Sequence, residues 1–267
     1  MSMETPPSAN PRSADLARRR LLAALGAGGA LALSGGAVLY AMPDAQNEAF
    51  PGERAAGQPV NASVRWGMLV EADKCTGCGA CVEACRQQNG LPVSNHPEDD
   101  PQWIRIVHLR DKRTGRQHQA PVMCQHCADA PCVDVCPTGA SFRRADGIVM
   151  VDKHICIGCR YCMMACPYKA RSFIAYPIEH HVVANPSGMG CVESCNLCAY
   201  RMDEQHIHGI NGTTACAAAC QREGHDVLLY GDLNDADSPL SRRLVAIGAH
   251  AIRPDLATDP GVLYHGI

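Results

Sequence analysis

Aromatic residues are scarce in this sequence: phenylalanine, tryptophan and tyrosine make up only 4% of its 267 residues. So few large rings argue against a core built mainly from aromatic side chains. Net charge is small as well, with a formal value of −3 and a pI near 6.4, which gives no reason to propose a nucleic-acid partner. The sequence contains no Walker A motif and no pattern of a hydrolytic triad. Its core and its chemistry must therefore come from another residue type.

That residue type is cysteine, with 17 copies, most of them in closely spaced groups. The third group reads CIGCRYCMMACP, the run in which three cysteines hold one 4Fe–4S cluster and the fourth reaches a neighbouring cluster. The second group, CQHCADAPCVDVCP, is the same motif with a longer middle loop. The first group, CTGCGACVEAC, lacks the final proline, and the fourth is split by a long insertion before its last two cysteines. Four groups of four cysteines predict four 4Fe–4S clusters.

Structural zinc is the alternative, because four thiolates also suit a tetrahedral zinc ion. Zinc sites typically pair two C-x2-C halves, and they do not explain a further cysteine three residues on, followed by proline. The spacing therefore favours iron–sulfur clusters. Metal binding would also contribute part of the folding energy that the aromatic-poor core lacks.

In this motif the fourth cysteine of one group binds the cluster held by a partner group, and this rule predicts which of the sixteen thiolates share a cluster. Local spacing pairs the second group with the third, and elimination then pairs the first with the fourth. The predicted first site is Cys75, Cys78, Cys81 and Cys220, and the second is Cys124, Cys127, Cys132 and Cys166. The third is Cys156, Cys159, Cys162 and Cys136, and the fourth is Cys195, Cys198, Cys216 and Cys85. Cys191 is left over, either as a substitute ligand in the fourth group or, as we favour, as a spare thiol. With every position held by cysteine and none open for substrate, we predict electron relays and no catalytic residue.

The remaining pattern predicts an α+β fold of tandem bacterial ferredoxin-like modules, with short strands and helices around the clusters. Residues 65–70 read as a strand, residues 103–123 and 141–152 as two hairpins, and residues 226–230 as a closing strand. We expect a short helix after the fourth cysteine of the first group, a polar loop over residues 86–102, and a helix over residues 238–249 with Ser238 as its N-cap. The tail to Ile267 reads as irregular, without an apolar run that could span a membrane.

Arg18, Arg19 and Arg20 precede an uncharged run from Leu21 to Met42. Paired arginines before a weakly apolar segment are typical of a twin-arginine signal, which exports proteins already folded. The run is also long enough to stay as an uncleaved membrane anchor. We therefore expect a periplasmic, membrane-associated protein.

The predicted organisation is a signal or anchor at 1–43, a linker at 44–64, an outer module at 65–123 plus 190–232, an inner module at 124–189, and a C-terminal helix and tail at 233–267.

The number, order and spacing of the cysteine groups resemble the four-cluster ferredoxin-type subunits of membrane-associated oxidoreductases, such as those serving dimethyl-sulfoxide, polysulfide and tetrathionate reductases. The resemblance covers about residues 65–232. The segments RWGMLV, PVMCQHC, LYGDLND and PGVLYHGI, with the stretch from PCVDVCP to KARSF, are most similar to DsrO-type periplasmic subunits of the Dsr transmembrane complexes of sulfur metabolism. In that family the outer groups share two clusters and the inner groups share two, as in the pairing above. The long insertion and Cys191 depart from the family pattern.

The resemblance implies a non-catalytic electron-transfer subunit. It implies two partners, a polytopic quinone-interacting membrane subunit and a multihaem cytochrome c, between which single electrons pass through the clusters. The alternative that it leaves open is the electron-transfer subunit of a periplasmic molybdopterin reductase of the polysulfide, tetrathionate or dimethyl-sulfoxide type.

Overall fold

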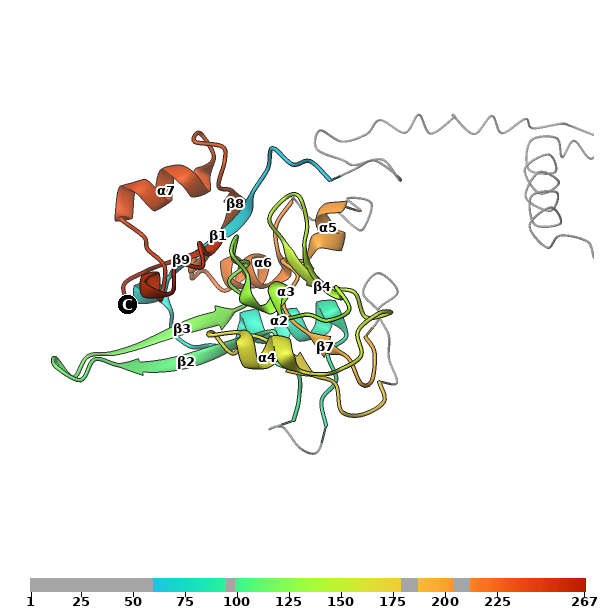
Figure 1. Ribbon diagram of the computed structural model, residues 1–267. Coiled ribbons are helices and arrows are strands. Elements are labelled where there is room, and N and C mark those ends of the chain that lie inside the picture. The colour runs from blue at the N-terminus through green and yellow to red at the C-terminus, as the bar shows by residue number, and fades with distance from the viewer. Residues whose placement is uncertain (1–59, 95–98, 179–186, 204–211) are drawn as a thin grey trace, which may run out of the picture. The chain divides into compact units, whose positions relative to one another are not determined.

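The computed structural model describes residues 60–94, 99–178, 187–203 and 212–267, and the signal and most of the linker predicted above lie outside these ranges. The chain contains both helices and short strands, so the prediction of a mixed α+β fold is confirmed, with the elements arranged as in Figure 1. The strands are β1 (Trp66–Glu71), β2 (Ile104–Arg110), β3 (Gln117–Met123), β4 (Ser141–Arg143), β5 (Val149–Val151), β6 (Ser172–Phe173), β7 (Val192–Glu193), β8 (Leu228–Asp232) and β9 (Val262–His265). The helices are η1 (Ala72–Lys74), α2 (Ala80–Asn89), α3 (Pro131–Asp134), α4 (Tyr161–Ala165), α5 (Ala199–Asp203), α6 (Ala215–Arg222), α7 (Pro239–Ile247) and η2 (Pro254–Leu256).

Strand β1 is the centre of a three-stranded sheet in the order β8-β1-β9. It pairs antiparallel with β8 and parallel with β9, with Val70 opposite both Leu228 and Tyr264. The prediction that the C-terminal tail is irregular is therefore wrong. Val262 and Tyr264 are fully buried in β9, so the end of the chain closes the sheet.

The three remaining strand pairs are two-stranded and antiparallel. The predicted hairpin over residues 103–123 is confirmed as β2 and β3, and that over 141–152 as β4 and β5. Gly147 has φ of 88° in the second turn, a left-handed conformation that glycine adopts without strain. The pairing of β6 with β7 joins segments on either side of the stretch 179–186, which lies outside the described residues.

The helix predicted after the first cysteine group is placed wrongly. Helix α2 begins at Ala80, inside the group, and carries both Cys81 and Cys85 before it ends at Asn89. Gly79 at its N-cap and Gly90 at its C-cap both adopt left-handed conformations, which start and stop the helix sharply. The residues 86–89 that were predicted as polar loop are therefore helical.

The predicted C-terminal helix is confirmed as α7, with Ser238 as N-cap and Pro239 at the first helical position. The Ser238 hydroxyl accepts a hydrogen bond from the Ser241 N–H at 3.0 Å. Leu240 turns inward and is fully buried. Helix α7 lies over the sheet beside β8 and β1 (Figure 1).

Glu71 at the end of β1 forms an ion pair with Arg243 of α7 and so ties this helix to the sheet. Its buried carboxylate accepts hydrogen bonds from Arg243 Nε at 3.1 Å and Nη2 at 2.6 Å, and Lys74 Nζ lies 2.8 Å away. The Arg243 hydrogen bond is the main cause that holds the pKa of Glu71 below its usual value. A carboxyl with a depressed folded pKa stabilises the fold above its unfolded pKa, and this contribution is lost as the pH falls through the folded pKa.

We therefore expect Glu71→Gln to lower the free energy of unfolding at pH 7 by about 1–2 kcal/mol, the low end for charged hydrogen bonds because Arg243 is partly exposed to solvent. The loss should shrink as the pH falls below the unfolded value of 4.5, where wild-type Glu71 becomes protonated. The rate of unfolding in denaturant, followed by tryptophan fluorescence at several pH values, measures the loss as faster unfolding, because unfolding that releases metal is irreversible. The matched control is Asp255→Asn, which breaks an exposed pair with Arg253 and should change the unfolding far less than Glu71→Gln does. A loss that stays constant from pH 7 to below 4.5 would contradict the assignment.

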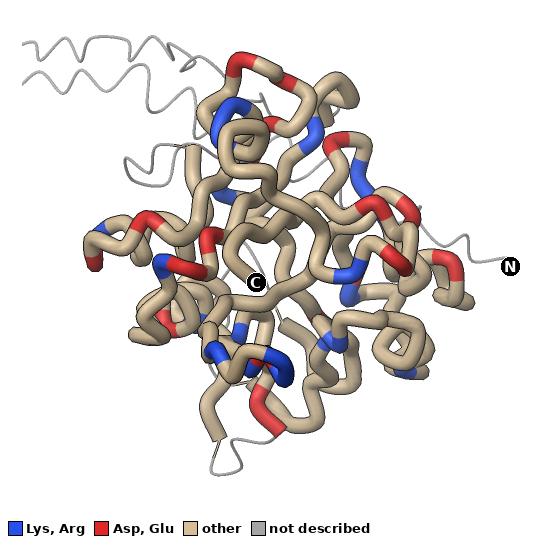
Figure 2. Tube along the Cα trace, turned by 90° about the vertical axis from the view of Figure 1, so that its left-hand side faces the viewer, with Lys and Arg blue, Asp and Glu red and all other residues tan. Residues whose placement is uncertain are grey.

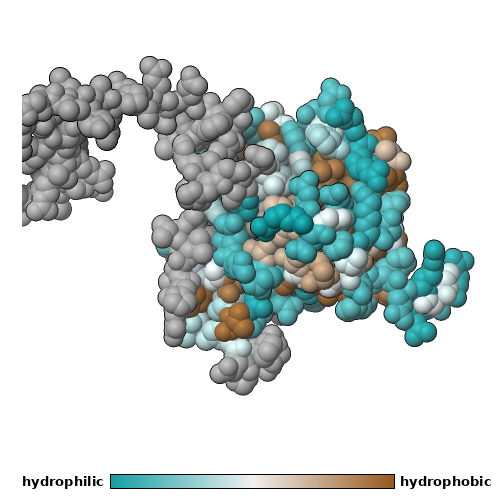
Figure 3. Space-filling view, turned by 180° about the vertical axis from the view of Figure 1, so that it is seen from behind, coloured by the Kyte–Doolittle hydropathy of each residue, from teal (hydrophilic) through white to brown (hydrophobic). Residues whose placement is uncertain are grey.

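The described surface is mixed in charge and polarity. Figure 2 shows basic and acidic residues interspersed over one face, and Figure 3 shows hydrophobic residues scattered among hydrophilic ones on another. Within the ranges that the structure describes, no helix combines the length and the hydropathy that a bilayer crossing needs.

Candidate iron–sulfur sites

The loop of the first cysteine group is shaped by glycines. Gly77 and Gly79 have φ of 73° and 78°, so the chain turns tightly between η1 and α2. The left-handed conformation at Gly77 favours glycine, whereas a Cβ there would meet only the end of the flexible Gln119 side chain. This turn leaves Cys78 exposed while Cys81 and Cys85 are buried on α2.

Helices α2 and α6 pack against each other and bring the first and fourth groups together. Each carries two cysteines four residues apart, Cys81 and Cys85 on α2 and Cys216 and Cys220 on α6, a spacing that places both on one helix face.

The electrostatic contacts of these cysteines link the members of each predicted site and also cross between the two sites, as from Cys85 to Cys81. The thiol of Cys81 interacts with Cys75, Cys78 and Cys220, which are the other members of the predicted first site, and also with Cys216. Cys195 interacts with Cys85, Cys198 and Cys216, the other members of the predicted fourth site.

Helices α3 and α4 form a similar pair for the inner groups. Cys132 and Cys166 interact with each other and with both Cys124 and Cys127, so the predicted second site is gathered in one place. Cys162 interacts with Cys156 of the predicted third site and with Cys132 of the second. The membership of Cys136 and Cys159 in the third site stays a prediction.

Backbone donors point at these sulfurs. N–H groups donate to Cys136 Sγ from Ser141 at 3.3 Å, to Cys156 Sγ from Val192 at 3.5 Å, and to Cys198 Sγ from Ala215 at 3.5 Å. Such N–H···S bonds stabilise thiolates and help to set cluster potentials.

The buried thiols are hard to ionise without metal. Burial is the main cause that raises the pKa of Cys81, Cys124 and Cys216 to about 12. Burial alone would raise the pKa of Cys136 too, but hydrogen bonds from Ser141 and Thr138 bring it below the usual value. Iron would supply the positive charge that such thiolates need, and all seventeen cysteines are free of disulfides. The donor set thus fits iron–sulfur clusters.

The four predicted sites differ in exposure. Cys78 of the first site and Cys159 of the third are exposed to solvent, whereas every cysteine of the second and fourth sites is buried. Apolar side chains surround Cys159 in sequence, with Ile157 and Met164 each 66% exposed. Gly158 has φ of 67°, and a Cβ there would lie 2.1 Å from Gly190 O, so this loop packs against the backbone of Gly190.

Two tyrosines link the second and fourth sites. The fully buried Tyr264 of β9 interacts electrostatically with Cys195 and with Tyr168. Tyr168 in turn interacts with Cys127 and Cys166, and its hydroxyl lies 2.9 Å from Thr258 Oγ1. The C-terminal residues therefore fill the space between the two halves of the cysteine framework.

Three polar side chains near the cysteines were not predicted from the sequence. Arg171 is buried and donates to Cys132 Sγ at 3.0 Å, and the buried Arg201 lowers the pKa of Cys198 against the dominant effect of burial. His126 lies between two predicted ligands, where burial and the charge of Arg171 lower its pKa to about 3. No local motif marks a buried arginine, because its burial depends on how distant segments pack.

Cys191 lies elsewhere than its place in the sequence suggests. Although it is close in sequence to the fourth group, its thiol donates to the carbonyl of Lys153 at 3.2 Å and interacts with Cys156 of the third group. The thiol therefore lies beside Lys153 and Cys156. That Cys191 is a spare thiol stays a prediction.

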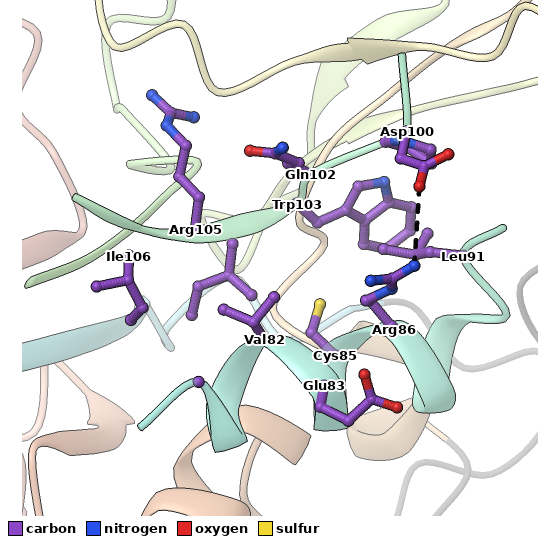
Figure 4. A pocket seen from close by; sticks show the side chains of 13 residues that line it. Val82, Glu83, Cys85, Arg86, Leu91, Asp100, Gln102, Trp103, Arg105 and Ile106 are labelled. Atoms are coloured by element: carbon purple, nitrogen blue, oxygen red, sulfur yellow. Dashed lines mark ion pairs between the residues drawn. The ribbon is translucent and has the colours of Figure 1, made fainter. Parts of the chain in front are cut away.

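A surface pocket of about 400 Å³ reaches the fourth site from outside (Figure 4). Cys85 forms part of its wall beside Trp103 and Leu91, and an ion pair between Arg86 and Asp100 at 3.9 Å crosses one side. Cys85 therefore lies at a wall that solvent can approach, although it is itself only 6% exposed.

Among the described residues, no three histidine, cysteine or carboxylate side chains converge closely enough to share a single metal ion. Cluster ligands bind different iron atoms and need not converge on one point. Metal analysis is therefore the test that separates zinc from iron.

Comparison with known proteins agrees with the cysteine pattern. The family described as 4Fe-4S dicluster domain matches residues 117–226, and a second family of the same description matches residues 74–140. The two matches confirm tandem dicluster domains and 4Fe–4S clusters. The module boundaries and individual ligands stay predictions.

Relatives extend the match over most of the chain. The Hdr-like menaquinol oxidoreductase iron-sulfur subunit 1 of Archaeoglobus fulgidus is 36% identical over 93% of this chain and 97% of that protein. One of the subunits of the tetrathionate reductase of Salmonella typhimurium is 30% identical over 95% of this chain and 89% of that protein. One of the subunits of the sulfite dehydrogenase of Allochromatium vinosum is 32% identical over 74% of this chain and 81% of that protein.

Proposed function

Since this chain belongs to the family of iron–sulfur electron-transfer subunits of oxidoreductase complexes, we propose that it relays single electrons through four 4Fe–4S clusters in sulfur metabolism, between a membrane quinone-linked subunit and a periplasmic redox partner. The observation that carries the proposal is that the cysteines lie in groups, and that two of the four predicted sites include a cysteine exposed at the surface. The ligands of the first and third sites include exposed cysteines, and those of the second and fourth sites are all buried.

The contacts support one order of sites. The first and fourth sites share α2 and α6, the fourth and second are linked through Tyr264 and Tyr168, and the second and third meet where Cys132 approaches Cys162. We therefore propose the order first, fourth, second, third. Electrons would enter or leave near Cys78 at one end and near Cys159 at the other.

When bound, the clusters would supply reversible one-electron chemistry. The chain's own residues bind them, bury the cysteines of the second and fourth sites and direct N–H groups at the sulfurs. No proton transfer is required of any side chain. The partners that we propose are a polytopic quinone-interacting membrane subunit and a multihaem cytochrome c, and two of the relatives are named as subunits of a menaquinol oxidoreductase and of a menaquinone reductase.

We expect about sixteen irons and about sixteen labile sulfides per chain, four of each per cluster. The measurement is iron, zinc and acid-labile sulfide on protein purified without oxygen. A value of about twelve irons would remove one site from the proposal, most readily the fourth, whose group carries the insertion. Tightly bound zinc with little labile sulfide would overturn the relay altogether.

Purification of the tagged chain in mild detergent, with its companions identified by mass spectrometry, tests the partners. A multihaem cytochrome together with a polytopic membrane subunit supports the proposal. A large molybdopterin subunit would instead favour the second candidate, the electron-transfer subunit of a periplasmic reductase. The names of the tetrathionate reductase and sulfite dehydrogenase relatives favour that candidate.

We also propose that the chain is exported by the twin-arginine route and acts in the periplasm, attached to the membrane through its partners or an uncleaved N-terminal anchor. Residues 1–43, on which this rests, lie outside the described residues. Fractionation into periplasm, membrane and cytoplasm is the direct test, and a chain found only in the cytoplasm would contradict it.

A further inference from the structure

Arg171 lies between the two inner cysteine groups and is buried. It follows α4 and directly precedes β6, and only 5% of it is exposed. Its Nη2 donates to Cys132 Sγ at 3.0 Å, whereas Nε and Nη1 have no hydrogen-bond partner among the described residues. A charged group placed in the interior in this way is unfavourable unless negative groups surround it.

The negative groups acting on Arg171 are thiolates. Its electrostatic partners are Cys132, Cys124 and Cys162, which are thiolates when they hold iron. Two of these cysteines belong to the predicted second site and one to the third. The guanidinium is therefore a fixed positive charge at the junction of two cluster sites, and nearest to the second.

We infer that Arg171 is a positioning residue that raises the reduction potential of the second cluster site through its charge and its hydrogen bond to Cys132. Reduction adds one negative charge to a cluster, so a nearby positive charge favours the reduced form. In a buried site this attraction is stronger than in water, because water does not screen it. Hydrogen bonds to cluster sulfur act in the same direction. The inference rests on the proposed four-cluster relay and extends it.

Arg201 provides a matched control in the other half of the framework. It is 7% exposed and acts on Cys198 of the predicted fourth site. Its Nη1 donates to the side chain of Gln88 at 3.1 Å. Arg160 provides a second control, because it follows Cys159 on the exposed loop and stacks over Phe173 at 3.7 Å.

The experiment is a redox titration of the full chain, loaded with clusters and followed by electron paramagnetic resonance. The signal of the second site is identified as the one lost in Cys124→Ala. In Arg171→Met we expect the reduction equilibrium constant of that cluster to fall at least tenfold, a shift of about 59 mV toward negative potential for one electron. Arg171→Lys keeps the charge and should recover more than half of the shift. Arg201→Met should move a different signal, and Arg160→Gln should have a smaller effect that vanishes at high salt.

The inference is overturned if Arg171→Met binds its full iron and the potential of the second site does not change. It is equally overturned if Arg201→Met shifts that same signal as much, or if Arg171→Met and Arg171→Lys both lose the cluster, because Arg171 would then be structural. These outcomes are distinct from failure of the relay itself, which would appear as missing iron in the unaltered protein.

Discussion

Replacing Cys220 by alanine is expected to remove one cluster, about four of about sixteen irons, and that cluster should be the one held by the first group. Cys220 lies near the end of α6, and its thiol interacts with Cys78 and Cys75 across the α2–α6 contact. Without this thiolate the first site has three ligands. The fourth site keeps all of its own, because Cys216 lies one helical turn earlier on α6 and interacts with Cys198.

The measurement compares iron, labile sulfide and electron paramagnetic resonance difference spectra of four variants. Cys220→Ala and Cys75→Ala should lose the same signal, and Cys216→Ala should lose the signal that Cys195→Ala loses. The control is Cys191→Ala, which removes a buried thiol that lies outside the four predicted sets and should leave the iron content unchanged. If Cys220→Ala and Cys195→Ala lose the same signal, the crossover between the first and fourth groups is wrong.

Helices α2 and α6 show how much of the structure the cysteine spacing alone can predict. In the first and fourth groups the last two cysteines are four residues apart and lie on one face of α2 and of α6, whereas the sequence predicted a helix only after the fourth cysteine of the first group. The spacing does not reveal that α2 starts within its group. That start depends on Gly79 in a left-handed conformation, and many glycines in loops could have served as well.

Elements defined by local chemistry were predicted well. The hairpin of β4 and β5 follows from Asp146 and Gly147 in its turn, and α7 follows from Ser238 and Pro239 at its start. In each case the signal and the structure that it causes are a few residues apart. No partner elsewhere in the chain has to be known.

Elements defined by distant partners were missed. Strand β9 has only four residues, and it becomes a strand because β1, almost the whole described chain away, offers it a free edge. Short apolar segments have weak intrinsic strand preference, so their tertiary context decides. The burial of Arg171 has the same origin. The sequence shows an arginine soon after a cysteine group, but the packing of α3, α4 and β6 is what places it beside Cys132.

Because β9 depends on its packing in the fold, we expect the largest effect on stability from replacing Tyr264, which lies in this strand. Its ring is fully buried, its hydroxyl donates to Pro121 O at 3.2 Å, and it accepts a hydrogen bond from Gln125 Nε2 at 3.2 Å. Removing a buried aromatic ring leaves a cavity and costs about 3–5 kcal/mol, a large part of the roughly 5–15 kcal/mol that stabilises a typical domain. Tyr264→Phe keeps the ring and should cost only about 1–2 kcal/mol, for the two hydrogen bonds.

Because Tyr264 lies between the second and fourth sites, its loss should loosen both halves of the framework together. Unfolding that releases metal is irreversible, so the proper measurement is the rate at which cluster absorbance disappears in denaturant. Tyr264→Ala should bleach in a single phase, much faster than the unaltered protein, with Tyr264→Phe between them. Val245→Ala on α7, where the side chain is 85% exposed, should bleach like the unaltered protein. If Tyr264→Ala bleached in two phases, with half of the clusters lost at the unaltered rate, the C-terminal strand would stabilise one module and not the junction.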